Sequence, residues 1–203
     1  MLQTADLIVR NATVLTMDPD RRVIMGGEVV IEKDRIKAIG KSEDLRKKYK
    51  APKVIDGTER LVMPGFVNSH IHFYHHMHKG LAPENLGGWA WSNWVHSRIA
   101  TILNAEDEIS GGLSVLIETL KSGTTTVLEA GSYNPEAVIE GVADLGMRVI
   151  VGRRVYDKVP PSASGQTALV QATDTCLKLN ESFVSKYKNG LAGGRVVPHV
   201  CIV

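Results

Sequence analysis

The sequence predicts an α/β protein in which a small, mostly β-structured module precedes a series of βα units with a parallel sheet. Three observations support this class. Short apolar runs separated by turn residues fill residues 1–62. From residue 63 onward, β-branched runs alternate with longer helical segments, which is the pattern of βα units. Five histidines between His70 and His78 follow the first strand of this second region. We therefore assign residues 1–62 and 63–203 to two domains.

The composition is that of an ordinary globular protein and excludes several partners. The chain has 203 residues, of which 43% are hydrophobic and 23% are charged, and its net charge is +2. Such a small net charge favours neither nucleic acid nor a membrane surface as a partner. The first ten residues lack the pattern of a signal peptide. Two cysteines, Cys176 and Cys201, form no disulfide framework, so we expect a cytoplasmic protein.

The first module is predicted to consist of short strands. Turn residues break its apolar runs, most clearly at 18–20, where Asp, Pro and Asp follow one another. Alternating runs on either side of Lys33 and Asp34 predict a β-hairpin with one face in water. Ser42, followed by two acidic residues, predicts a short helix over 43–49. The strands expected in this module cover residues 7–9, 14–15, 28–32, 35–39, 54–57 and 61–63.

The second region is predicted to contain four strands separated by helices. Its first strand follows Pro64 and Gly65, where the character of the sequence changes. Asn134 is expected to cap the helix between the second and third strands, with Pro135 at the first helical position. The strands are expected near 66–69, 125–128, 148–151 and 196–201, and the helices near 92–103, 106–121, 135–144 and 167–188.

His70 and His72 come directly after the first strand of this region. Residues i and i+2 of a strand point to the same side, so the two imidazoles can converge on one point. Neutral imidazole is a good ligand for zinc or ferrous iron, and such a pair supplies two of the three or four protein ligands required. Two histidines at this spacing also occur simply as polar loop residues. Their position at the carboxyl end of a strand within a βα series favours a metal site.

The run from Val62 to His72 resembles the first barrel strand of the amidohydrolase superfamily. Residues 6–15 and 34–40 resemble the β-sandwich of that family. The resemblance implies the N-terminal part of a composite β-sandwich followed by the first half of a (β/α)8 TIM-type barrel. Residues 79–81, 89–94 and 122–126 resemble the branch that contains s-triazine hydrolases and guanine, cytosine and methylthioadenosine deaminases.

The resemblance also implies a reaction. One divalent metal, with Zn²⁺ favoured and Fe²⁺ as the alternative, is expected on His70 and His72. It would activate water to attack a ring carbon of a small heterocycle, so that ammonia, an amine or chloride leaves. The family's other catalytic groups come from strands five to eight and thus lie beyond Val203. Binuclear members carry a carboxylated lysine at the end of strand four, and residues 189–203 contain no lysine, which favours one metal.

The length leaves the barrel incomplete. A whole barrel takes about 250 residues, which is more than the entire chain holds. A half barrel has two open sheet edges, so we expect the chain alone to be poorly soluble or partly unfolded, and inactive. It would require a complementing C-terminal half or a second copy of itself. Two alternatives remain open at this point: a non-catalytic split or degraded subunit, and a binuclear cyclic-amide hydrolase.

Two candidate substrate contacts lie in or near the histidine loop. His75 stands where the family often has Gln, and it either faces the substrate or is an exposed loop histidine, as we expect for His76 and His78. Trp91, with Trp89 and Trp94, either forms a flat wall for a planar heterocycle or anchors helix packing.

Two further candidates end predicted strands, at the edge where barrel chemistry is built. Glu129 either orients a metal-bound histidine or forms a surface salt bridge. Arg153 is a candidate to bind a carboxylate or carbonyl of the substrate. Its neighbour Arg154 points to the opposite side of the strand, so at most one of the two faces the site.

Overall fold

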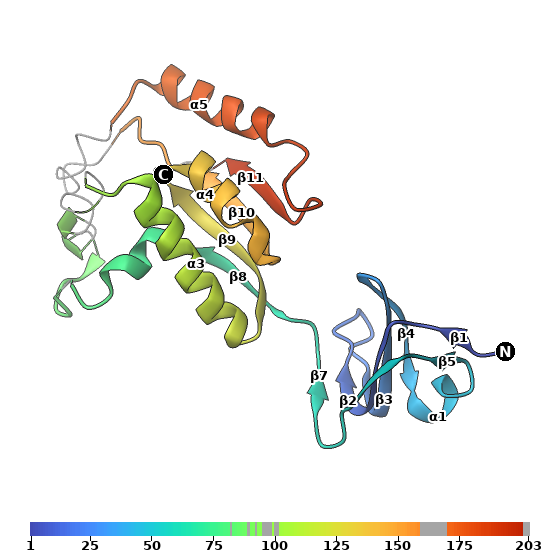
Figure 1. Ribbon diagram of the computed structural model, residues 1–203. Helices are drawn as coiled ribbons and strands as arrows, with labels where there is room; N and C mark the ends of the chain where they lie inside the picture. Colours follow the sequence, from blue (N-terminus) through green and yellow to red (C-terminus); the bar gives the residue numbers. More distant parts are fainter. Residues whose placement is uncertain are drawn as a thin grey trace. The chain divides into compact units, whose positions relative to one another are not determined.

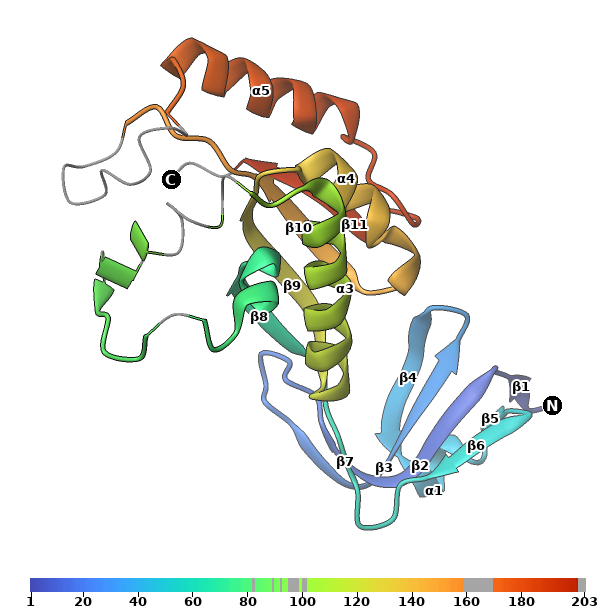
Figure 2. The same ribbon diagram turned by 60° about the vertical axis from the view of Figure 1, so that its left-hand side comes forward.

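The computed structural model describes residues 1–81, 83–88, 90–91, 93–94, 99, 102–158 and 170–200. The chain forms two compact units, Met1–Pro64 and Gly65–Val203. Figures 1 and 2 show the elements of each unit from two directions. No helix in the described part of the chain is long and apolar enough to cross a membrane.

The first unit is built around a five-stranded sheet. Its strands are β2 (Leu7–Leu15), β3 (Val23–Glu32), β4 (Arg35–Lys41), β6 (Lys53–Asp56) and β7 (Leu61–Val62). The order is β4-β3-β2-β6, and β7 also pairs with β2. The hairpin expected around Lys33 and Asp34 is present as the antiparallel pair β3–β4. Ile8, Val30 and Leu45 form one small buried cluster in this unit.

Both runs predicted at 7–9 and 14–15 lie in one continuous strand, β2; within it Asn11 takes a positive φ of 63°, and the pairing with β3 shifts register there. One local prediction for the first unit was wrong. The helix expected over 43–49 is only α1 (Ser42–Leu45), and β5 (Tyr49–Lys50) pairs with β1 (Gln3–Thr4) instead. Ser42 does not cap α1, since its hydroxyl donates to the Gly27 carbonyl and accepts the Asn11 amide.

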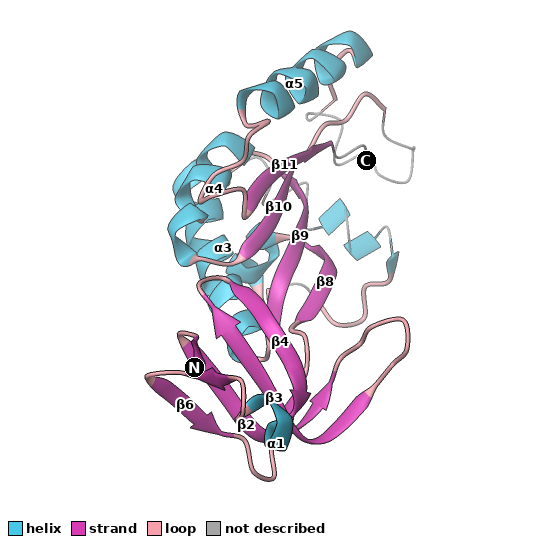
Figure 3. Cartoon of the chain, turned by 90° about the vertical axis from the view of Figure 1, so that its right-hand side faces the viewer, coloured by secondary structure: helices cyan, strands magenta, loops and turns pink. Residues whose placement is uncertain are grey.

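The second unit contains four parallel strands in the order β11-β10-β9-β8. Helices connect consecutive strands, and Figure 3 shows α3 and α4 on one side of this sheet. Among the described residues, β8 and β11 each pair with one strand, as expected for part of a barrel. The strands are β8 (Phe66–Ile71), β9 (Thr124–Ser132), β10 (Arg148–Arg153) and β11 (Val196–Val200); the helices are α3 (Ala105–Lys121), α4 (Pro135–Gly141) and α5 (Thr173–Lys186).

The core of the second unit lies between the sheet and its helices. Apolar residues of β9, β10 and β11 pack there against α3, α4 and α5. Its fully or almost fully buried members include Leu116, Val127, Ile139, Val149, Val151, Phe183 and Val196. This packing holds the strands in place, so that their carboxyl ends lie along one edge of the sheet.

The helix predictions for the second unit differ from the structure at their ends. Asn104 caps α3 through a reciprocal pair of hydrogen bonds with Asp107. Asn134 precedes α4 but does not cap it through its side chain. The last helix begins at Thr173 rather than near 167. The helix expected near 92–103 lies mostly outside the described residues, and residues 159–169 lie entirely outside them.

Candidate active site at the carboxyl edge of the parallel sheet

The histidine loop is held against α3. After β8, residues Phe73–His78 form the 3-10 helix η1, and Phe73 is 1% exposed. A Cβ atom on Gly112 would lie 2.7 Å from Phe73 Cδ2, and one on Gly111 would lie 2.7 Å from the Phe73 carbonyl oxygen. Because both positions are glycine, η1 can approach the helix closely. This contact fixes the segment that carries three of the five clustered histidines and directly follows His72.

The structure brings His70 and His72 together. Their ring centres lie 4.9 Å apart, with the ring planes at 88°. Both residues line a cavity of about 530 Å³, together with His75, His76 and Trp91. His72 has extended backbone dihedral angles, so the strand geometry continues as far as this residue. The alternation that predicts convergence of the two imidazoles is therefore present.

Glu129 is fully buried in the carboxyl-terminal half of β9. Its Oε1 atom lies 3.9 Å from His72 Nδ1, and its Oε2 atom accepts a hydrogen bond of 2.9 Å from the Gly131 amide. Burial raises the pKa of this carboxyl group to about 8. The alternative of a surface salt bridge is wrong, because the side chain is inaccessible and faces an imidazole.

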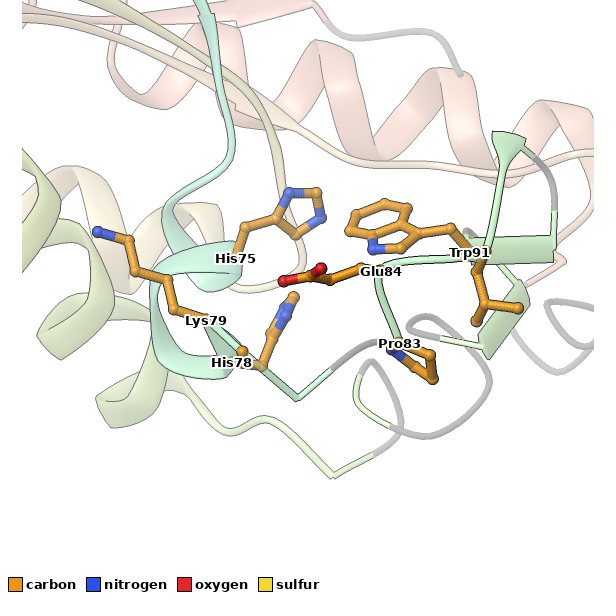
Figure 4. A pocket seen from close by; sticks show the side chains of 8 residues that line it. His75, His78, Lys79, Pro83, Glu84 and Trp91 are labelled. Carbon is orange, nitrogen blue, oxygen red and sulfur yellow. The ribbon is translucent and has the colours of Figure 1, made fainter.

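His75 and Trp91 lie between two cavities. Their ring centres are 5.2 Å apart in an edge-to-face arrangement. Both line the cavity beside His72 and a second cavity of about 400 Å³, into which Figure 4 shows His78 and Glu84 also directed. His78 is only 7% exposed, contrary to the expectation of an exposed loop histidine, and burial lowers its pKa. Trp89 lies outside the described residues.

Arg153, the last residue of β10, and Arg154, which follows it, point in different directions, as the alternation predicts. Arg153 forms an ion pair with Glu136 of α4, and its guanidinium lies 5.6 Å from the ring centre of Phe183 on α5. The structure therefore directs this candidate towards the helices. Arg154 instead donates hydrogen bonds to the hydroxyls of Tyr74 and Tyr156. It is Arg154, not Arg153, that reaches the residues around His72.

Sequence reasoning missed a buried carboxylate in this region. Glu108, in the first turn of α3, is 1% exposed. It accepts hydrogen bonds from the Tyr133 and Asn134 amides at 3.1 and 3.0 Å, and from the Ser132 hydroxyl. Burial raises its pKa. An acidic residue in a first helical turn is ordinarily explained by the helix dipole, so no local signal reveals this role.

The residues present fit part of a metal site. His70 and His72 offer nitrogen ligands of the type that zinc prefers, and Glu129 Oε1 has no hydrogen-bond partner among the described residues. Within the described part of the chain, no group of three or more His, Cys, Asp or Glu side chains gathers as a full ligand set would. The pair therefore supplies part of a ligand set rather than all of it.

Comparisons with known proteins agree with this geometry. A sequence model of the amidohydrolase family matches residues 61–201. The chain is 35% identical over 196 residues to a 5-methylthioadenosine/S-adenosylhomocysteine deaminase of Thermodesulfovibrio yellowstonii, covering 95% of this chain and 43% of the relative. It is 36% identical over 147 residues to a 5'-deoxyadenosine deaminase of Methanosarcina acetivorans, covering 71% of this chain and 32% of that relative.

Solved structures share the fold at lower identity. A zinc-bound adenosine deaminase from Xanthomonas campestris matches with a TM-score of 0.83 and 19% identity, over 98% of this chain and 43% of the other. A zinc complex of atrazine chlorohydrolase from Arthrobacter aurescens matches with a TM-score of 0.75 and 22% identity, over 97% of this chain and 46% of the other. The chain thus spans less than half the length of these proteins. The family model covers well over half of the chain, which therefore belongs to the amidohydrolase family.

Proposed function

We propose that the whole protein is a metal-dependent hydrolase that cleaves a C–N bond of a cyclic, nucleobase-like substrate. One observation carries this proposal: two imidazoles with ring centres 4.9 Å apart end the first strand of an amidohydrolase sheet, beside a cavity of about 530 Å³. The activity is assigned to the whole protein because this chain spans 43% of its deaminase relative. Cytoplasmic location and inactivity of the chain alone stay predictions.

His70 and His72 would hold one divalent metal. Zn²⁺ is the favoured ion, because imidazole nitrogen suits it and because two solved structures of this fold contain it. When bound, such an ion lowers the pKa of water and polarises the electrophilic carbon of the substrate. Glu129 faces the Nδ1 side of His72, where a buried carboxylate restricts the orientation of the imidazole.

The remaining residues shape the space for the substrate. His75 and Trp91 present ring edges and faces to the cavity beside His72, which suits a planar heterocycle. The proton transfers that accompany loss of the leaving group are assigned to residues beyond this chain. The names of the relatives make adenine nucleosides the first substrate class to test and chlorinated or amino s-triazines the second.

Metal content of the whole protein tests the proposal. We expect one equivalent of Zn²⁺ in the purified protein, a large loss in both H70A and H72A, and retention in H76A, which removes a neighbouring histidine outside the pair. Ammonia release from 5'-methylthioadenosine and 5'-deoxyadenosine should be lost in the same two variants. Unchanged metal content in both H70A and H72A would contradict the ligand assignment and favour a non-catalytic subunit.

A further inference from the structure

Arg154 joins tyrosines that follow three successive strands. Tyr74 comes from η1 after β8, Tyr133 directly follows β9, and Tyr156 follows β10. The guanidinium carbon lies 5.7, 5.5 and 5.2 Å from the ring centres of Tyr74, Tyr133 and Tyr156, respectively. The nitrogens of the Arg154 guanidinium also donate hydrogen bonds to the hydroxyls of Tyr74 and Tyr156. A single side chain thus connects all three loops at the carboxyl edge of the sheet.

The chemistry of this group requires arginine. A planar guanidinium can stack on aromatic rings and donate in fixed directions to two hydroxyls, whereas the lysine ammonium is a point charge on a flexible stem. Tyr74 and Tyr156 are 1% and 4% exposed, so their rings have little freedom to move. Burial raises the pKa of Tyr133, so its hydroxyl stays protonated beside the cation.

The connection reaches the candidate active site through Tyr74. The ring centre of Tyr74 lies 5.4 Å from that of His72 and 4.5 Å from that of His75. His75 in turn contacts Trp91, and these two residues line both cavities. A change in the position of Tyr74 would therefore move the boundary between the cavity beside His72 and the cavity that contains Glu84. Arg154 itself lines neither of these cavities.

We propose that Arg154 is a positioning residue that determines substrate selectivity. This inference rests on the proposed function. Arg154 holds Tyr74 in position, and Tyr74 in turn holds His75 and Trp91. The positions of these side chains then determine which group attached to the reacting ring fits the site. The reacting ring occupies the cavity beside His72, and its substituent occupies the cavity of His78 and Glu84. Loss of Arg154 then changes which substituents are accepted while the metal ligands stay in place.

Steady-state kinetics of the metal-loaded whole protein test this inference. For R154M we expect unchanged Zn²⁺ content, a rise in KM for 5'-methylthioadenosine, and a loss in kcat/KM of about 10- to 100-fold. R154K should restore little of this loss because lysine cannot donate to two hydroxyls in fixed geometry. The ratio of kcat/KM for 5'-methylthioadenosine and 5'-deoxyadenosine should also shift, since these substrates differ only in the substituent.

The ratio of kcat/KM for the two nucleosides shows whether Arg154 positions the site residues or only supports the fold. A variant that merely unfolds in part loses active molecules, which lowers kcat but leaves KM and the ratio unchanged. That result for R154M would overturn the inference. Y74F should shift the ratio in the same direction as R154M. K186M, which removes an exposed lysine 4.7 Å from the ring centre of Tyr187, should leave the ratio unchanged.

A second measurement tests the positioning role of Arg154 independently of the proposed substrate class. With Trp89, Trp94 and every tryptophan of the whole protein outside these 203 residues replaced by phenylalanine, acrylamide quenching of fluorescence would report on Trp91. We expect stronger quenching when R154M is added, because Trp91 loses its fixed contact with His75. If the wild-type protein acts on neither nucleoside, the proposed substrate class fails, and this quenching still decides whether Arg154 positions Trp91. Identical quenching with and without Arg154 would overturn the positioning role.

Discussion

Each of the two units of the chain contains a fully buried carboxyl group, but the two groups have different partners. In Met1–Pro64, Glu28 of β3 is fully buried, and its Oε2 atom accepts a hydrogen bond of 2.6 Å from Nε of Arg10 on β2. In Gly65–Val203, Glu129 of β9 is equally buried but faces the His72 imidazole at 3.9 Å, and burial raises its pKa to about 8.

This difference distinguishes a buried carboxylate that supports the fold, in the first unit, from one that belongs to the candidate active site, in the second unit. A guanidinium bound directly to a buried carboxylate offsets much of the cost of removing that charge from water. A buried carboxyl group with a strongly raised pKa lacks such compensation, and groups of this kind concentrate at functional sites. We therefore interpret the first unit as support and the carboxyl edge of the second unit as the place of chemistry.

Removal of Arg10 should give the largest loss of stability. R10M leaves Glu28 buried without its cation, so we expect the first unit to lose about 3–5 kcal/mol of its free energy of unfolding. Hydrogen exchange of the β2 and β3 amides, followed by mass spectrometry, would measure the loss locally. R22M, which removes the exposed Arg22–Asp18 pair, is the control and should change exchange little. Equal effects of the two variants would contradict the scaffold interpretation.

Replacement of Glu129 should instead affect the metal. Partners that orient metal-bound histidines typically contribute a factor of about 10–100 to metal affinity, so we expect E129Q to weaken Zn²⁺ binding by that amount in the whole protein. Competition with a chelator would measure the affinity. E28Q is the matched control in the other unit, and it should reduce stability without changing metal affinity. Equal Zn²⁺ affinity of E129Q and E28Q would contradict the assignment of Glu129 to the metal site.

Sequence alone predicts the elements whose signals are local. The β3–β4 hairpin follows from alternation around Lys33 and Asp34, and all four strands of the second sheet follow from β-branched runs between helices. The proximity of His70 and His72 follows from strand periodicity, because two residues on one strand need no tertiary information to lie on the same side.

Features made by distant residues are not predictable in this way. Alternation shows that Arg153 and Arg154 diverge, but the choice between them depends on the tyrosines of other loops. Glu108 binds the loop after β9 only because α3 packs beside that strand. The two-residue strands β1 and β5 carry too few residues for any periodic signal, and each is stabilised by pairing with the other.

A change at Gly112 should disturb the site loop without changing any charge. G112A places a methyl group 2.7 Å from Phe73 Cδ2, so we expect a loss of about 1–3 kcal/mol from overpacking. Alanine has a higher helix propensity than glycine, by up to about 1 kcal/mol, and this gain opposes the loss. S114A, on the exposed face of the same helix, is the control. A higher melting temperature for G112A would contradict the close contact between η1 and α3.

The smallest effect should be a pH dependence that arises from Glu108. Because burial raises its pKa, the folded chain binds this proton more tightly than the unfolded chain. The contribution of Glu108 to stability is therefore fully present below its ordinary pKa of 4.5 and is lost as the pH rises through the raised value. The limit for one proton is about 1.4 kcal/mol per pH unit.

E108Q removes this titration, so the stability difference between wild type and E108Q should fall as the pH rises above 4.5. Urea unfolding at several pH values measures it, with E106Q as the control for loss of a negative charge in the same helical turn. Arg154 and Glu129 also act on this group, in opposite directions, which keeps the net slope small. A difference that increases with pH would instead mean that the three donors from Ser132, Tyr133 and Asn134 outweigh burial and favour the ionised carboxylate. Glu108 would then resemble the compensated Glu28 rather than Glu129, and the boundary between scaffold and site would run between α3 and β9.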